Sequence, residues 1–263
     1  FFVLLFAGSP VPISVPGLGL INYVLVIDHY RLLTLALLLP TALVLMQSRR
    51  TIAFGRAPVD SFVLAYFLLV SGLEFRESSF THGTRGVITH AIDIFLPYYV
   101  VSRSIRDIEG FKAALTGFVI AACLLAPLAL FESLRGWRLY TAVQIPLGLN
   151  PFVWSGYLGR AGLLRAAVSL GHPIVLGFVF MVALGFLLFL NRSLAKNWQR
   201  WLVWIALTLG LLSSLSRGPW VGALLLGLAI AIDAGKPLQN LLKTGILIAL
   251  IVAVLGVFSV GQQ

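Results

Sequence analysis

Long apolar runs recur along almost the whole chain and constrain its fold more than any other feature. A helix needs about 20 mainly apolar residues to cross the hydrocarbon core of a bilayer. The runs that approach this length cover 31–47, 61–74, 87–102, 112–131, 173–190, 201–215, 219–232 and 244–261, and a shorter run covers 1–7. They predict a polytopic helical bundle with at least eight spans and a partial first one.

The composition excludes a water-soluble globular domain. Hydrophobic residues make up 59% of the 263 residues and charged residues only 11%, whereas soluble domains contain about 45–50% and about 25%. The single cysteine, Cys123, excludes disulfide scaffolds and cysteine-ligated metal clusters. We therefore expect an all-α integral membrane protein in which residues 1–263 form a single membrane domain within the lipid bilayer. Because apolar runs stand at both ends, we expect the chain to be a fragment of a longer one.

The basic residues predict the orientation of the spans. Loops 48–60, 103–112, 191–200 and 233–243 contain all the lysines and many of the arginines, which is typical of cytoplasmic loops. The remaining basic residues, on the outer side, are all arginines: Arg31, Arg76, Arg85, Arg135, Arg138, Arg160, Arg165 and Arg217. Arginine binds phosphate in a planar, bidentate manner, although each of these could instead extend toward lipid headgroups. The net charge of +10 is thus attributed to the membrane setting, and no nucleic-acid partner is expected.

The longest hydrophilic segment, approximately 132–172, lies on the outer side in this topology. It combines arginines such as Arg160 and Arg165 with aromatic residues such as Trp154 and Tyr157. Such a mixture suits a sugar-phosphate ligand, although the aromatic residues are equally typical of the membrane interface. The segment ends in His172-Pro173, where Pro173 suits the first turn of a helix. His172 is therefore expected beside a helix N-terminus, either as a cap or as part of a site.

A second polar turn, from Ser213 to Trp220, separates two apolar runs on the same side. Ser216 suits an N-cap and Pro219 a first helical turn. Backbone N–H groups, the positive end of the helix dipole and Arg217 would then form an anion site. The topology is compatible with Arg165 and Arg217 binding one diphosphate.

An ionisable pair is expected inside the run 87–102. Asp93 follows His90 by three residues, so the two side chains can share a helix face. Such a pair suggests a proton pathway, and the alternative is a structural pair that holds two helices together.

At these residues the chain resembles the O-antigen ligase and Wzy-type polysaccharide polymerase superfamily. The matching elements are Arg165 followed by His172-Pro173 at the head of a span, and the Ser216-Arg217-Gly218 turn two spans later. The resemblance implies a GT-C-like glycosyltransferase of the bacterial inner membrane with a periplasmic active face. Its donor would be an undecaprenyl-diphosphate-linked glycan and its acceptor a glycan or a lipid A-core, with no metal or other cofactor.

The candidate site follows from the motifs and the resemblance together. We expect catalysis to involve Arg165, Arg217 and His172, and substrate binding to involve Arg160, Ser216, Gly218, Trp154 and Tyr157. Of these, Arg165 and Arg217 match the arginines that hold the donor diphosphate in the family. The family's general base is a histidine in a later periplasmic loop, which we expect beyond residue 263. The alternatives are a multi-span transporter of an anion such as bicarbonate, and a non-catalytic subunit of a glycan export complex.

Overall fold

A computed structural model describes residues 1–8, 27–48, 51–77, 79–146, 159–160, 162–190 and 197–233. Within these ranges the chain is mostly helical, and its long helices coincide with the apolar runs predicted between residues 31 and 232. Four helices are long and apolar enough to cross a membrane: His29–Gln47, Pro58–Arg76, Ile108–Arg135 and Pro173–Leu190. The prediction of an all-α membrane protein is confirmed at this level. The predicted span 244–261 lies outside the described residues.

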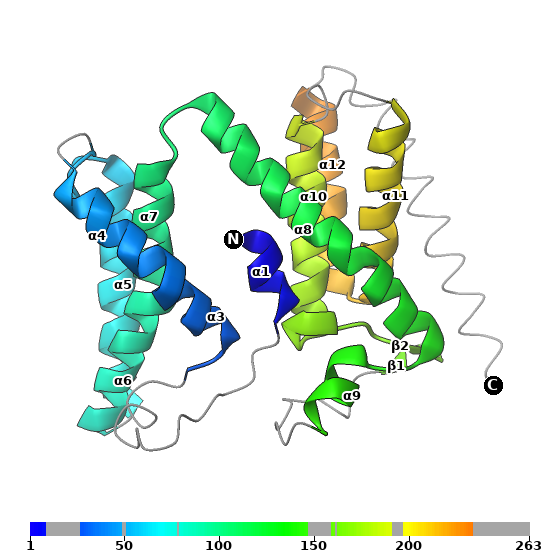
Figure 1. The fold of residues 1–263 in the computed structure, drawn as a ribbon, viewed down its shortest axis with the longest axis horizontal. Coiled ribbons are helices and arrows are strands. Elements are labelled where there is room, and N and C mark those ends of the chain that lie inside the picture. The colour runs from blue at the N-terminus through cyan, green and yellow to red at the C-terminus, as the bar shows by residue number, and fades with distance from the viewer. Residues whose placement is uncertain are drawn as a thin grey trace. The chain divides into compact units, whose positions relative to one another are not determined.

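The chain divides into two compact units, which are described separately. One unit is Pro10–Phe111, and the other combines Phe1–Ser9 with Lys112–Gln263. The long helix α8 (Ile108–Arg135) begins at the boundary and runs almost wholly within the second unit. Figure 1 labels the helices and strands of both units.

In the described part of the unit Pro10–Phe111 there are three long helical segments, two of them interrupted by a π-helical turn. The elements are α3 (His29–Leu33), η1 (Thr34–Leu38), α4 (Leu39–Gln47), α5 (Pro58–Glu77), α6 (Phe80–His90), η2 (Ala91–Phe95) and α7 (Leu96–Ser104). Pro40 and Pro97 are each the second residue after a π-helical turn. Proline has no N–H to donate to the preceding turn, and a π-helical turn is one way in which a helix accommodates that loss.

A buried ion pair links α5 to α7 in this unit. Arg103 Nη2 donates to Asp60 Oδ2 at 2.7 Å, and both side chains are almost fully buried. The Tyr98 hydroxyl donates to Asp60 Oδ1 at 2.6 Å. The Arg103 guanidinium also lies over the rings of Phe54, Tyr98 and Tyr99. Arg103, expected in the basic loop 103–112, therefore lies in α7 and is paired with a carboxylate inside the helix packing.

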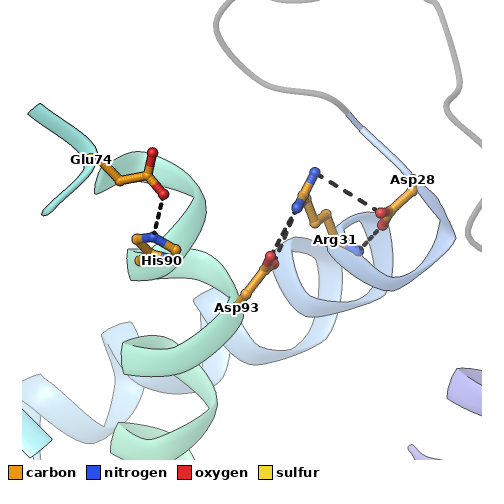
Figure 2. Close-up of polar contacts among 5 residues, drawn as sticks. All are labelled: Asp28, Arg31, Glu74, His90 and Asp93. Atoms are coloured by element: carbon orange, nitrogen blue, oxygen red, sulfur yellow. Dashed lines mark hydrogen bonds and ion pairs between the residues drawn. The ribbon is translucent and has the colours of Figure 1, made fainter. Parts of the chain in front are cut away.

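The expected Asp93–His90 pair is wrong, because each of these residues has a different partner (Figure 2). Arg31 donates to Asp93 through Nη2 at 2.9 Å and through Nε at 3.2 Å, while His90 Nε2 lies 3.2 Å from Glu74 Oε1. The π-helical turn η2 begins at Ala91, between the two residues, and changes the face on which Asp93 lies. Each observed pair joins two different helical segments.

The second unit, within its described residues, is built around α10, which packs against α11 and α12. Its elements are α1 (Phe2–Ala7), α8, α9 (Leu139–Gln144), the strands β1 (Gly159–Arg160) and β2 (Leu163–Leu164), the 3₁₀ turn η4 (Val168–Leu170), α10 (Pro173–Leu190), α11 (Asn197–Ser213) and α12 (Arg217–Asp233). The two strands are antiparallel, with Arg160 opposite Leu163. Pro173 begins α10 and Pro219 lies in the first turn of α12, as predicted.

Helix α10 packs against α11 and α12 (Figure 1), and its buried residues form part of the core of this unit. Leu176, Phe180, Ala183 and Leu187 recur at helical spacing and are completely buried. Gly177 allows a close approach: a Cβ atom there would lie 2.7 Å from Pro219 Cγ and 2.8 Å from Ser214 Oγ. This approach brings the start of α10, the end of α11 and the start of α12 together at one end of the unit.

Candidate functional site

Two of the predicted arginines converge on the turn between α11 and α12. Arg160 Nη1 donates to the Leu215 carbonyl at 2.7 Å, and Arg165 Nη2 donates to Ser216 Oγ at 2.9 Å. The Ala166 N–H donates to the Ser213 carbonyl at 3.1 Å and holds the two chain segments together. The structure therefore brings Arg160, Arg165 and Ser216 into one cluster, whereas the sequence predicted only that they lie on the same side of the membrane.

The backbone is strained on both sides of this cluster. Leu215 has φ +45° and Val168 has φ +49°, and no other non-glycine residue of the described ranges has a positive φ. A non-glycine residue in the left-handed region costs about 1–3 kcal/mol and persists only where its surroundings impose it. At Leu215 this conformation ends α11 and presents the carbonyl that Arg160 binds.

A buried carboxylate and a serine hold the segment that carries Arg165. Glu132, near the end of α8, is 1% exposed, and its Oε2 accepts hydrogen bonds from the N–H groups of Ala167 and Val168 at 3.1 and 2.9 Å. Its Oε1 accepts the N–H of Leu139 at 3.2 Å. Ser169 donates to the carbonyl of Phe6 in α1. These contacts fix the path of the chain between Arg165 and α10.

His172 caps α10. The N–H of Ile174 donates to His172 Nδ1 at 3.2 Å, which is the position of an N-cap contact. Burial and the nearby Arg165 lower the pKa of His172 from its usual value of 6.5. The neutral ring therefore carries its proton on Nε2, because Nδ1 accepts the capping bond. This arrangement suits a cap and a hydrogen-bond donor better than a general base.

Ser216, Arg217 and Gly218 form the start of α12. Ser216 stands at the N-cap position, and its hydroxyl accepts from Arg165 and donates to the Ser214 carbonyl at 3.0 Å. Arg217 and Gly218 are exposed, and a Cβ atom at Gly218 would meet no other atom within 4 Å. The first N–H groups of a helix have no acceptor within that helix. The start of α12 is therefore open to a ligand of negative charge.

The electrostatics of the cluster are dominated by positive charge. Burial and the neighbouring Arg160 lower the pKa of Arg165, and burial lowers the pKa of Arg138, with partial compensation from Glu132. Arginine nevertheless stays protonated at neutral pH. The acceptors of Arg160 and Arg165 described above are neutral oxygens, while the carboxylate of Glu132 binds backbone N–H groups. The cluster therefore favours an anion.

The remaining expectations for the site have different outcomes. Trp154 and Tyr157 lie outside the described residues. Glu132 and Leu215 were missed; an acidic residue directly after the apolar run 112–131 was the available signal for Glu132. The left-handed conformation of Leu215 has no signal in the sequence. Within the described ranges, no group of three or more His, Cys, Asp and Glu side chains is arranged to hold a metal ion.

Comparison with known proteins adds no relative of this chain. No protein-family model, no curated protein and no solved structure matches its sequence or its fold.

Proposed function

We propose that this chain is a glycosyltransferase that moves a glycan from undecaprenyl diphosphate to a glycan or lipid A-core acceptor at the periplasmic face of the bacterial inner membrane. In this proposal, Arg160, Arg165 and Arg217 hold the donor diphosphate at the start of α12. The observation that carries it is the convergence of Arg160 and Arg165 on the strained Leu215–Ser216 turn.

Three properties of the cluster support a diphosphate ligand. The guanidinium groups of Arg160 and Arg165 lie close enough for their like charges to repel, and burial and this repulsion lower the pKa of Arg165. That repulsion is relieved when a dianion binds between them. The starts of α10 and α12 meet at the same end of the unit and add the positive ends of two helix dipoles. A lipid-linked donor would also be anchored in the bilayer that the apolar helices occupy.

These groups can assist glycosyl transfer without forming a covalent bond to the donor. As the bond between the sugar and the diphosphate breaks, negative charge grows on the leaving diphosphate. Fixed guanidinium groups and helix N-termini stabilise that charge in the transition state, and the loss of one such donor typically lowers the rate about 10²–10³-fold. An acceptor hydroxyl also requires a general base, and His172 already uses its Nδ1 lone pair for the cap.

A transfer assay with the full-length chain tests this proposal. The protein would be purified in nanodiscs and supplied with lipid-linked donor and acceptor from the source organism, and release of undecaprenyl diphosphate and growth of glycan would be followed. We expect Arg165→Ala and Arg217→Ala to lower turnover about 10²–10³-fold. Arg76→Ala is the matched control, because Arg76 is an exposed arginine at the end of α5 in the other unit.

The outcomes separate the competing functions. Loss of turnover in both site variants, with Arg76→Ala unaffected, would support the transferase and its diphosphate site. Full turnover in both site variants would eliminate the site. The absence of turnover in the wild-type protein with native donor and acceptor would contradict the transferase, and would favour an anion transporter or a non-catalytic subunit of a glycan export complex.

A further inference from the structure

The carboxylate of Glu132, an acid beside an arginine cluster, binds backbone N–H groups. Its side chain is 1% exposed, and its two oxygens accept three backbone N–H groups, those of Leu139, Ala167 and Val168. A surface acid near several arginines would pair with a guanidinium. Here the carboxylate instead binds backbone amides, two of which belong to the segment that follows Arg165.

The Ala167–Val168 segment is shaped as an anion nest. Ala167 has φ −126° and ψ −26°, and Val168 has φ +49°. Successive residues of right-handed and then left-handed conformation turn their N–H groups toward one point, where they bind an anion. That anion is Glu132 Oε2. Because Val168 is β-branched, it adopts a positive φ only where contacts impose it, and the carboxylate supplies such contacts.

The nest is coupled to Arg165 by a short and well-anchored stretch of chain. Arg165 lies two residues before Ala167, and between them the Ala166 N–H donates to the Ser213 carbonyl at 3.1 Å. Arg165 then reaches Ser216 Oγ at 2.9 Å. A change in the nest would therefore rotate the backbone from which the Arg165 side chain extends.

We propose that Glu132 is a positioning residue, which holds the Ala167–Val168 nest and thereby sets the direction of the Arg165 guanidinium toward an anionic ligand at the start of α12. This inference rests on the proposed function, because Arg165 is the group that would touch the donor diphosphate. Glu132 itself touches no substrate.

Glu132→Gln tests the nest with almost no change in side-chain shape. An amide offers one acceptor oxygen and one NH₂ donor, so at least one of the three backbone N–H groups would face another donor. A displacement of a binding group by about 1 Å can lower a rate by about 10²-fold. We expect kcat with the lipid-linked donor to fall by about that factor, while KM for the acceptor stays unchanged.

The decisive experiment is a double-mutant cycle in the full-length chain in nanodiscs. If Glu132 acts through Arg165, the double variant Glu132→Gln/Arg165→Ala will turn over no more slowly than Arg165→Ala alone, because coupled residues are not additive. Ser71→Ala is the control, because Ser71 is also a buried polar side chain but lies in α5 of the other unit. Its effect should add to that of Arg165→Ala.

Hydrogen exchange provides a readout that does not depend on activity. We expect faster exchange of the Ala167 and Val168 amides in Glu132→Gln, with unchanged protection in α10 and α11. If Glu132→Gln fails to fold, Glu132→Asp is used instead, since it keeps the charge but cannot reach all three donors.

The failure of this inference can be distinguished from the failure of the proposed function. If Arg165→Ala keeps full turnover, the proposed diphosphate site is wrong and this inference falls with it. If Arg165→Ala loses turnover but the effect of Glu132→Gln is absent or additive, the site stands and Glu132 is only structural. Unchanged exchange at Ala167 and Val168 would also overturn the inference.

Discussion

Substitution of Gly177 by alanine should separate α10 from α12 at the end that carries the arginine cluster. The added Cβ would lie 2.7 Å from Pro219 Cγ and 2.8 Å from Ser214 Oγ, and both of these residues are buried and unable to move aside easily. Ordinary contact begins near 3.4 Å, so the two helices must move apart by about 0.7 Å. Overpacking of this kind costs about 1–3 kcal/mol, which a gain in helix propensity of about 1 kcal/mol partly offsets.

Gly72→Ala is the matched control, because a Cβ atom at this helical glycine of α5 would meet nothing within 4 Å. It should gain the propensity and suffer no overpacking. The thermal midpoint of the full-length chain in nanodiscs should therefore be lower for Gly177→Ala than for Gly72→Ala. With about 2–4 °C per kcal/mol for a domain of similar size, the difference should be about 2–12 °C. Equal midpoints would refute the close approach of α10 and α12.

Three further predictions concern single side chains. Arg103→Ala should lower the free energy of unfolding by about 3–5 kcal/mol, measured by thermal denaturation, because it leaves the buried Asp60 carboxylate without its partner. His172→Ala should cost about 1 kcal/mol above pH 7, whereas His172→Asn should retain the cap. The pKa of His172 is lowered in the folded protein. The stability that the His172 cap contributes is therefore fully present above the ordinary pKa of 6.5, and it is lost as the pH falls through the lowered pKa of the folded state. Gly218→Ala should not lower the thermal midpoint but should lower transfer, since its methyl group would occupy the open surface at the start of α12.

Each of these predictions has an outcome that would contradict it. A double variant that removes both Asp60 and Arg103 should be less damaging than either single variant, and additive losses would argue against the ion pair. A pH-independent effect of His172→Ala would argue against capping by a neutral ring. Full transfer activity in Gly218→Ala would argue against a ligand at this end of α12.

The positions of the long helices could be predicted from the sequence because burial in a bilayer demands continuous apolar runs. The start of α10 at Pro173 and the placement of Pro219 in the first turn of α12 also followed from local rules that need no tertiary contact. The expectation that Arg160 and Arg165 lie on one side of the membrane rests on a different signal, the distribution of lysine and arginine among the loops, and stays a prediction.

The pairings between helices could not be predicted in this way. Asp93 was expected to pair with His90 on one helix face, but the π-helical turn η2 intervenes and Arg31 takes the carboxylate from another helix. Arg103 was expected in a basic loop, whereas tertiary packing brings it to Asp60. Such contacts depend on how helices pack, and spacing along one helix contains no information about them.

Binding of farnesyl diphosphate to the full-length chain in nanodiscs, measured by calorimetry, tests the central claim most directly. Charge-assisted hydrogen bonds contribute about 1.5–3 kcal/mol, so Arg165→Ala should raise the dissociation constant by about 10-fold or more. Farnesol, which has no diphosphate, should bind the wild-type protein and this variant equally. The account predicts weaker diphosphate binding in Arg165→Ala and in Arg217→Ala. Equal dissociation constants in the wild-type protein and both variants would contradict it.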